Sequence, residues 1–232
     1  TSFILSDEDF PSGVALITVD KAGENSIVVA SGANANLHSK DMQKALDEIA
    51  AASLVLLQLE IPMDVVHFAV NYAASKNVKV ILNPAPANEL SEELLKNIDI
   101  LTPNKTEASM ISGVDVTNIE SAKKAAKAIC SKGVKNVVVT MGPLGAVICQ
   151  DGKFSVVAAQ KVETVDTTAA GDVFNGALAV ALCKGDSLEE AVGFACEAAA
   201  LSVTRLGAQS SIPYRNELIA RKLNIANIKE SQ

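Results

Sequence analysis

Short, continuous runs of Val, Ile and Leu constrain the fold of this chain more than any other feature of its sequence. Three such runs, at 53–60, 78–83 and 135–142, are separated by segments with helical spacing, such as 63–76. An apolar run without alternation is typical of a parallel strand that is buried on both faces. Strands that alternate with helices predict a mostly parallel sheet covered by helices on both faces. Because no linker, repeat or low-complexity tract divides the chain, we expect one α/β domain over residues 1–232.

Local signals add a hairpin and several helix starts to this outline. Two Val- and Ile-rich runs flank the glycine-containing segment 21–25, which predicts a β-hairpin near the N-terminal end of the chain. Helical spacing continues through 39–52. Two capping boxes are predicted from their spacing: Thr117 with Glu120, opening a helix through Ser131, and Ser187 with Glu190, opening the last long helix.

The charge and the apolar pattern exclude two classes of partner. The 232 residues are long enough to bury a sizeable core, and they carry a net charge of −7 with a pI near 4.9. The acidic residues are scattered, and no basic stripe exists that could neutralise phosphates along a strand, so we expect no nucleic-acid partner. No apolar run reaches the ~18 residues of a membrane span, so we expect no membrane partner.

The cysteine and histidine counts bear on compartment and chemistry. The four cysteines form no C-x-x-C pair, and we interpret them as reduced thiols of a cytoplasmic protein. With only two histidines, His38 and His67, the sequence gives little support to a zinc site or a Ser-His-Asp triad.

Ligands of open α/β sheets collect beyond the carboxyl ends of the strands. The last such position is the segment 166–172, where a helix is expected to begin near Ala170. Ala169, Ala170 and Gly171 are small enough to let an anion approach the unpaired N–H groups and the positive end of that helix. Asp172 beside them could then act as a general base for phosphoryl transfer to an alcohol. The alternative is that Asp172 only caps the helix.

The loop 140–145 suggests a nucleotide site. Its two glycines follow a predicted buried strand and would allow close approach by a base or a phosphate; the loop consists of Thr140, Met141, Gly142, Pro143, Leu144 and Gly145. The alternative is an ordinary turn between two strands. Neither a P-loop nor a G-x-G-x-x-G fingerprint after a strand occurs in the sequence.

Several of these segments, taken together, resemble the ribokinase-like (PfkB) carbohydrate kinase family. "DTTAAGDVFNGAL" resembles the C-terminal signature of that family, and "TPNKTE" resembles its Asn-x-x-Glu motif. "QLE", "NPAPA", "TMGPLG" and "TRLGAQSSIP" match in the same order, so the resemblance covers nearly the whole chain. It implies a ribokinase-like three-layer α/β/α fold with a Rossmann-like sheet.

The resemblance also implies an activity and a role for each matching residue. The reaction would be transfer of the γ-phosphate of ATP to the 5-hydroxyl of D-ribose, with Asp172 as base and Ala169, Ala170 and Gly171 as the anion hole. Asn104 and Glu107 would organise the ATP phosphates and Mg²⁺, mostly through water. Residues 140–145 would line the nucleotide, with Cys196 on the adenine side. Glu60 would lie near the sugar.

Members of the family also use K⁺, and the resemblance assigns its ligands here. The matching positions, several of which would act through backbone carbonyls, are Asp166, Thr168, Ser202, Arg205, Gly207 and Ser211. Without the resemblance, Arg205 and Gly207 are also typical of a helix C-terminus that carries a favourable cation and a glycine stop.

The N-terminal part of the family pattern, which grips the sugar, has no counterpart in this sequence. Residues 8–31 would supply a partial β-hairpin lid and the return strand. We expect that the chain is part of a longer protein; the alternative is that a partner or self-association covers the uncovered surface. A homodimer is plausible from the resemblance. Alternative functions are a kinase for another furanose or nucleoside, and a non-catalytic nucleotide-binding module.

Overall fold

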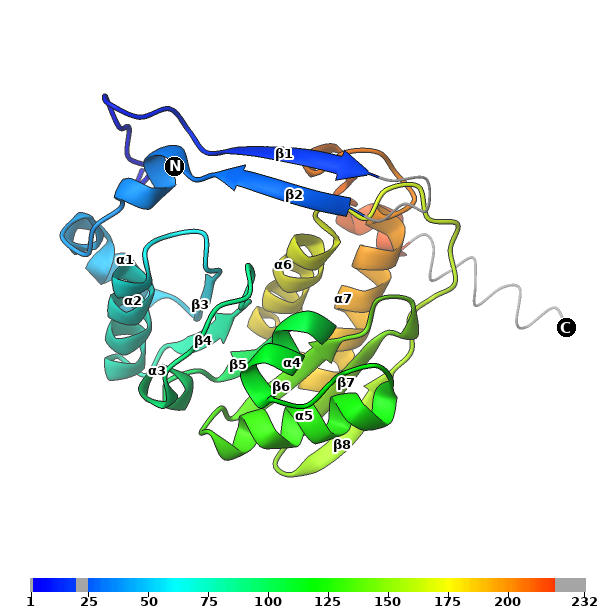
Figure 1. Cartoon of the computed structure of the whole chain (residues 1–232). Coiled ribbons are helices and arrows are strands. Elements are labelled where there is room, and N and C mark those ends of the chain that lie inside the picture. The colour runs from blue at the N-terminus through cyan, green and yellow to red at the C-terminus, as the bar shows by residue number, and fades with distance from the viewer. Residues whose placement is uncertain (1, 20–24, 220–232) are drawn as a thin grey trace, which may run out of the picture. The chain divides into compact units, whose positions relative to one another are not determined.

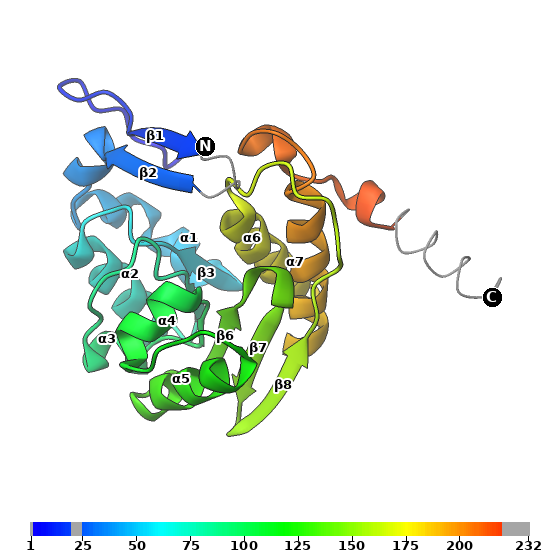
Figure 2. The same cartoon turned by 45° about the vertical axis from the view of Figure 1, so that its right-hand side comes forward.

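The computed structural model describes residues 2–19 and 25–219 (Figure 1, Figure 2). The chain divides into two compact units. One unit comprises residues 1–18 and 26–157, and the other comprises residues 19–25 and 158–232. That residues 1–232 form a single domain stays a prediction.

The first unit is built on a sheet with the strand order β3-β4-β5-β6-β7-β8. Its strands are β3 (Leu54–Leu57), β4 (Lys79–Leu82), β5 (Ile100–Leu101), β6 (Asn136–Thr140), β7 (Ala146–Gln150) and β8 (Lys153–Val157). The pairs from β3 to β6 are parallel, and β6-β7 and β7-β8 are antiparallel. The sheet is therefore mostly parallel, as the apolar runs predict.

Helices pack against this sheet within the same unit. They are α1 (Leu46–Ala51), α2 (Met63–Ser75), α3 (Glu92–Lys96), α4 (Lys105–Ser112) and α5 (Ile119–Ser131). Their apolar side chains form one core with alternate residues of the strands, such as Leu82, Leu101 and Val137. The intervening strand residues, such as Ile81 and Val138, are buried as well. The inner strands are thus buried on both faces, which explains their continuous apolar runs.

Strand β3 differs from its prediction. The run 53–60 predicts a strand buried on both faces, but β3 covers only Leu54–Leu57, and Leu56 is 39% exposed. The physical reason is its place in the sheet, because β3 pairs only with β4 and forms one edge of the sheet among the described residues. The position of a strand within a sheet depends on contacts that are distant in sequence, so the apolar run alone does not predict which strand lies at the edge.

The hairpin prediction is confirmed by β1 (Val14–Val19) and β2 (Asn25–Ala30), which form a separate two-stranded sheet. The connecting residues 20–24 lie outside the described part of the chain. Two 3₁₀ helices follow, η1 (Gly32–Asn36) and η2 (Asp41–Ala45). The helical segment predicted at 39–52 is therefore a 3₁₀ helix that continues into the short helix α1.

The predicted capping box of Thr117 and Glu120 is wrong by one residue. Helix α5 begins after Asn118, whose side chain accepts a hydrogen bond from the Ser121 N–H, while the Ser121 hydroxyl accepts one from the Asn118 N–H. Glu120 forms an ion pair with Lys123 instead. The reason is competition between neighbours, since Asn is at least as good an N-cap as Thr.

The second unit contains α6 (Ala170–Cys183) and α7 (Leu188–Ser202), which lie side by side (Figure 1, Figure 2). The predicted capping box of Ser187 and Glu190 is confirmed at the start of α7. A small core joins Val173, Ala198 and Leu218, and the 3₁₀ helix η4 (Gln209–Ser211) follows α7. Within the described ranges, no helix combines the length and the apolar character that crossing a membrane requires.

Candidate active site

In the first unit, the predicted ligand residues follow the carboxyl ends of neighbouring parallel strands. Glu60 follows β3, Asn83 follows β4, Asn104 follows β5 and Thr140 ends β6. Since these strands are parallel and adjacent, the four positions lie in a row along the side of the sheet where the carboxyl ends of the strands meet. The sequence argument placed them there from the alternation of elements alone.

Asn104 and Glu107 form a reciprocal cap at the start of α4. The Asn104 N–H and side-chain amide donate to the two Glu107 carboxylate oxygens, each at 2.8 Å, and the Glu107 N–H donates to Asn104 Oδ1 at 2.9 Å. Glu107 is 4% exposed, and its burial raises the pKa of its carboxyl, although the Asn104 N–H opposes that shift. Because both carboxylate oxygens are engaged, the pair fits contact with a metal through water better than direct ligation.

The loop 140–145 lies directly beside this cap. Thr140 forms a parallel bridge with Asn104, and the Thr140 N–H donates to the Pro103 carbonyl at 2.9 Å. The loop contains the 3₁₀ helix η3 (Gly142–Leu144) and is closed by a 2.7 Å bond from the Met141 N–H to the Gly145 carbonyl. Both glycines have positive φ, 59° at Gly142 and 93° at Gly145. The structure therefore brings the two predicted nucleotide segments together.

Within the loop, the side chains point to different environments. Met141 is buried at 1% exposure, Leu144 is 51% exposed, and a Cβ at Gly142 would meet no heavy atom within 4 Å. Met141 therefore anchors the loop in the core, while Gly142 and Leu144 leave its outer side open. Glu60, farther along the sheet edge, is exposed and accepts a 3.1 Å bond from the Gln58 side-chain amide.

In the second unit, the start of α6 has an unusual backbone. Ala169 is the N-cap residue and has a left-handed conformation with φ of 60°, so no side chain caps the helix. Only the Ala170 N–H is bonded there, to the Thr167 carbonyl at 3.2 Å. Within the part of the chain that the structure describes, the N–H groups of Gly171 and Asp172 have no acceptor. A Cβ at Gly171 would meet no heavy atom within 4 Å, so the approach to these donors is open.

Asp172 stands in the first turn of α6 without a hydrogen-bond partner among the described residues. Asp172 is exposed, so its desolvation by the surrounding protein is only partial. That desolvation raises the pKa of Asp172 above its ordinary value, while the helix N-terminus favours the ionised carboxylate. A carboxylate that caps its own helix would instead accept a backbone N–H. The geometry therefore favours the general-base interpretation over the capping alternative.

One residue of this region was missed by sequence reasoning. Asn175 is 4% exposed, and its side-chain amide donates to the Gly171 carbonyl at 2.9 Å, one turn back along α6. Asparagine is a poor residue for the interior of an apolar helix, and that contrast is the signal that could have identified it. It fixes the carbonyl of the glycine that precedes Asp172.

Asp166 connects two separate segments of the second unit. Its carboxylate accepts the Thr168 N–H and the Gly207 N–H, both at 2.9 Å. A hydrogen bond from the Thr168 side chain, together with these N–H groups, holds the pKa of Asp166 below its usual range. Three of the predicted K⁺ positions, Asp166, Thr168 and Gly207, are therefore adjacent, and the carboxylate is ionised at neutral pH.

The other predicted K⁺ positions have their own bonds. The hydroxyls of Ser202 and Ser211, both 1% exposed, donate to the carbonyls of Ala199 and Ala208, at 2.9 and 2.7 Å. Arg205 pairs with Glu217 at 2.5 Å. The Arg205 side chain therefore serves an ion pair rather than the end of α7. Sequence reasoning missed Glu217, and nothing local in the sequence indicates the pairing.

Two further observations concern metal ligation and Cys196. In the described ranges, no three His, Cys, Asp or Glu side chains are grouped closely enough to hold a metal ion. A K⁺ site built largely from carbonyl oxygens, as the resemblance implies, needs no such group. Cys196 is 7% exposed on α7, and burial, assisted by Glu197, raises the pKa of its thiol to about 11.

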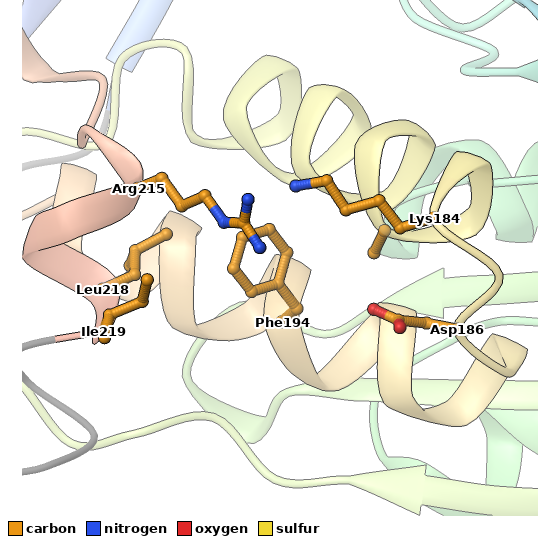
Figure 3. Close-up of a pocket in the computed structure, with 7 residues that line it drawn as sticks. Lys184, Asp186, Phe194, Arg215, Leu218 and Ile219 are labelled. Carbon is orange, nitrogen blue, oxygen red and sulfur yellow. The ribbon is translucent and has the colours of Figure 1, made fainter.

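A cavity of about 190 Å³ also occurs in the second unit (Figure 3). Its lining residues are Ala181, Lys184, Asp186, Phe194, Arg215, Leu218 and Ile219. None of them is a predicted site residue, so the cavity is separate from the candidate site.

Comparison with known proteins identifies the family. The family described as "pfkB family carbohydrate kinase" matches residues 1–215. The chain is 47% identical to a ribokinase of Haemophilus influenzae, over 90% of this chain and 68% of that protein. It is 36% identical to a deoxyribokinase of Salmonella typhi, over 87% of this chain and 66% of that protein.

A solved structure agrees with these sequence matches. The ribokinase of Arabidopsis thaliana, determined in complex with ribose and ATP, is 34% identical and has a TM-score of 0.84, covering 91% of this chain and 69% of that one. The likeness confirms the predicted ribokinase-like fold. Sequence and structure thus agree that this chain belongs to the pfkB family of carbohydrate kinases.

Proposed function

We propose that the chain transfers the γ-phosphate of ATP to the 5-hydroxyl of D-ribose, with Asp172 as general base. The similarity to ribokinases supports the reaction and the acceptor. The observation that carries the site assignment is the start of α6. Two N–H groups without an acceptor, at Gly171 and Asp172, stand beside the Asp172 carboxylate, which has no hydrogen-bond partner within the described residues.

The chemistry follows from these groups. The Asp172 carboxylate takes the proton of the sugar hydroxyl, the hydroxyl oxygen attacks the γ-phosphorus, and the bond to the β,γ-bridging oxygen breaks to release ADP. The small residues Ala169, Ala170 and Gly171 let the negative charge approach the N–H groups and the positive end of the helix. Because phosphoryl transfer depends mainly on positioning and charge stabilisation, few other groups are needed.

All proposed nucleotide residues except Cys196 belong to the first unit. Residues 140–145 would line ATP, and their open glycine surface supports this role. Asn104 and Glu107 would hold Mg²⁺ through water, which suits a carboxylate whose oxygens are already bonded. Mg²⁺, when bound, neutralises charge on the phosphates. Cys196 is assigned to the adenine side and Glu60 to the sugar.

The K⁺ assignment is part of the same proposal. Asp166 fits a hard cation because its carboxylate is ionised at neutral pH. Thr168, Ser202, Arg205, Gly207 and Ser211 would add oxygen ligands. The hydroxyl of Ser202 and that of Ser211 each donate to a nearby carbonyl. The lone pairs of each hydroxyl oxygen are not used in that bond and could face a cation.

The acceptor has one close competitor. The similarity to a deoxyribokinase favours another furanose as second candidate, at lower identity than the ribokinase match. We further propose a cytoplasmic homodimer without nucleic-acid or membrane partners. The net charge of −7 and the four free cysteines support the compartment and the excluded partners.

The test is the substitution Asp172→Asn in the full chain, with Asp186→Asn as the matched control. Asp186 is an exposed aspartate of the same unit, beyond the end of α6. We expect Asp172→Asn to lower kcat with D-ribose and ATP by about 10²–10⁴-fold while ADP binding is kept. The control should change nothing. If Asp172→Asn leaves phosphoryl transfer unchanged, Asp172 is not the base. If the unsubstituted chain binds ADP but transfers no phosphate, the chain is a binding module and not a kinase.

A further inference from the structure

Two of the four cysteines lie against each other in the first unit. Cys130 is near the end of α5 and Cys149 is in β7, and the Cys130 thiol donates to Cys149 Sγ at 3.4 Å. Both are free thiols. The other two, Cys183 and Cys196, lie on α6 and α7 of the second unit.

The backbone around the pair is firmly held. Cys149 is 1% exposed, and its strand position pairs with Val137 on one side and Phe154 on the other. Cys130 is half-buried, and its helix packs on the sheet through Ala122, Ala126 and Ile129. The two sulfur atoms are therefore kept close by regular elements and not by mobile loops.

We propose that Cys130 and Cys149 form an oxidisable dithiol that a hydroperoxide converts to an intramolecular disulfide. The sulfur of Cys130, the more exposed of the two, attacks the peroxide and breaks its O–O bond, which gives a sulfenic acid and one molecule of water or alcohol. The sulfur of Cys149 then displaces the sulfenic oxygen, which leaves as water with the remaining proton. Two thiols lose two electrons, and the hydroperoxide gains them.

The geometry suits this reaction. A disulfide requires an S–S length of about 2.05 Å, so the sulfur atoms, now 3.4 Å apart, must approach by roughly 1.3 Å. The crosslink would enclose residues 130–149, a segment that includes β6 and the loop 140–145. The modification thus lies on the frame of the proposed nucleotide loop.

The environment of the Cys130 thiol makes the rate of this reaction depend on pH. Burial, with the hydrogen bond that Cys130 donates to Cys149 as second cause, raises the pKa of the Cys130 thiol to about 12. The thiolate is the reacting form, so below that pKa its fraction, and with it the rate, rises about tenfold for each pH unit. The pair is therefore slow to oxidise at neutral pH and much faster in alkali.

The test uses the full chain and hydrogen peroxide. The protein is oxidised at pH 7 and pH 9, remaining thiols are alkylated, and unreduced peptides are mapped by mass spectrometry. We expect the peptide that holds Cys130 to be linked to the peptide that holds Cys149, roughly 100-fold faster at the higher pH. Dithiothreitol should separate the two peptides again.

Variants define the outcome further. The double variant Cys183→Ser/Cys196→Ser should keep the crosslink, whereas Cys149→Ser should drive Cys130 to the sulfinic acid instead. Recovery of Cys130 and Cys149 as alkylated thiols after Cys183 has been oxidised would overturn the proposal. So would a link from either of them to Cys183 or Cys196. The mapping of the unsubstituted protein decides the matter even where a variant fails to fold.

Discussion

The proposed anion hole has one strained backbone residue, Ala169. It has φ of 60° although it carries a Cβ, and it sits directly before the first residue of α6. Non-glycine residues in this conformation cost about 1–2 kcal/mol, and such strain is typical of functional positions. Here the left-handed residue turns the chain so that the helix begins without a side-chain cap, which leaves its N–H groups available.

A bulkier residue at position 169 should increase the strain and so destabilise the folded chain. Ala169→Val is expected to lower the free energy of unfolding by about 1–2 kcal/mol, because a β-branched side chain fits the left-handed region badly. The control is Ala179→Val, a similarly part-buried site inside α6, where helix propensity alone costs ~0.5 kcal/mol. Urea unfolding measures both. Equal losses would show that Ala169 is not strained.

The raised pKa of Asp172 makes a prediction about pH. Only the ionised carboxylate can take the proton of the acceptor, so kcat/KM for D-ribose should fall about tenfold for each pH unit below that pKa. Because desolvation moves the pKa upward, the fall should begin at a higher pH than an ordinary aspartate would give. A profile of kcat/KM from pH 4 to 8 measures it. A midpoint at or below the ordinary aspartate value would contradict the desolvation of Asp172, and a profile without a fall would contradict its role as base.

At the scale of elements, two capping boxes of the first unit allow the loss of helix stability to be distinguished from a loss of ATP binding. Asn104 with Glu107 opens α4, and Asn118 with Ser121 opens α5. Both Glu107→Ala and Ser121→Ala remove a reciprocal cap, so each should lower the free energy of unfolding by ~1 kcal/mol. Only Glu107→Ala should also raise the KM for ATP. A matching rise in Ser121→Ala would mean that the effect comes from helix fraying alone.

The elements also show what local sequence can and cannot predict. The inner strands were predictable because burial on both faces leaves a continuous apolar run, as at 78–83. The edge position of β3 was not, since it depends on strand order. The cap of α7 was predicted correctly from Ser187 and Glu190. At α5, Asn118 displaced Thr117, a choice between two adjacent residues that spacing alone does not decide.

The same limit applies to the candidate site. Asp172, the small residues before it and the loop 140–145 were predictable because each motif is continuous in sequence. Asp166 was predicted only from a family resemblance, and its bond to Gly207 spans two distant segments. Contacts of this kind, like the pairing of Arg205 with Glu217, arise from tertiary folding and leave no mark in local composition.

At the scale of the whole molecule, the predicted site residues belong to two units. The nucleotide residues Asn104 and Thr140 belong to the first unit, and Asp172 and Asp166 belong to the second. Each group has its own hydrogen bonds, and the described N–H groups without an acceptor, at Gly171 and Asp172, belong to the second unit. Phosphoryl transfer needs both groups, so activity tests the chain as a whole, whereas capping and strain test each unit alone.

The two-stranded sheet of β1 and β2 carries the prediction for assembly. Its residues Val14, Leu16, Ile17, Val28 and Val29 are each at least 41% exposed. Successive strand residues face opposite sides of a sheet, so these exposed apolar side chains lie on both of its faces. Exposed apolar surface is typical of protein interfaces, and a second copy of the chain would cover part of it in the proposed homodimer. The double variant Leu16→Lys/Val28→Lys places charges on that surface, which should favour the monomer because buried unpaired charges are costly.

Light scattering during size-exclusion chromatography measures the outcome. We expect the unsubstituted chain at twice its mass of 24.1 kDa and the double variant at the mass of one chain. Val156→Lys is the matched control, since Val156 is 43% exposed on β8, outside the β1-β2 sheet, and should leave the dimer intact. Unchanged circular dichroism confirms that each variant is folded. A dimer that survives the double substitution would place the interface elsewhere, because two lysines would not be tolerated at the centre of an apolar contact.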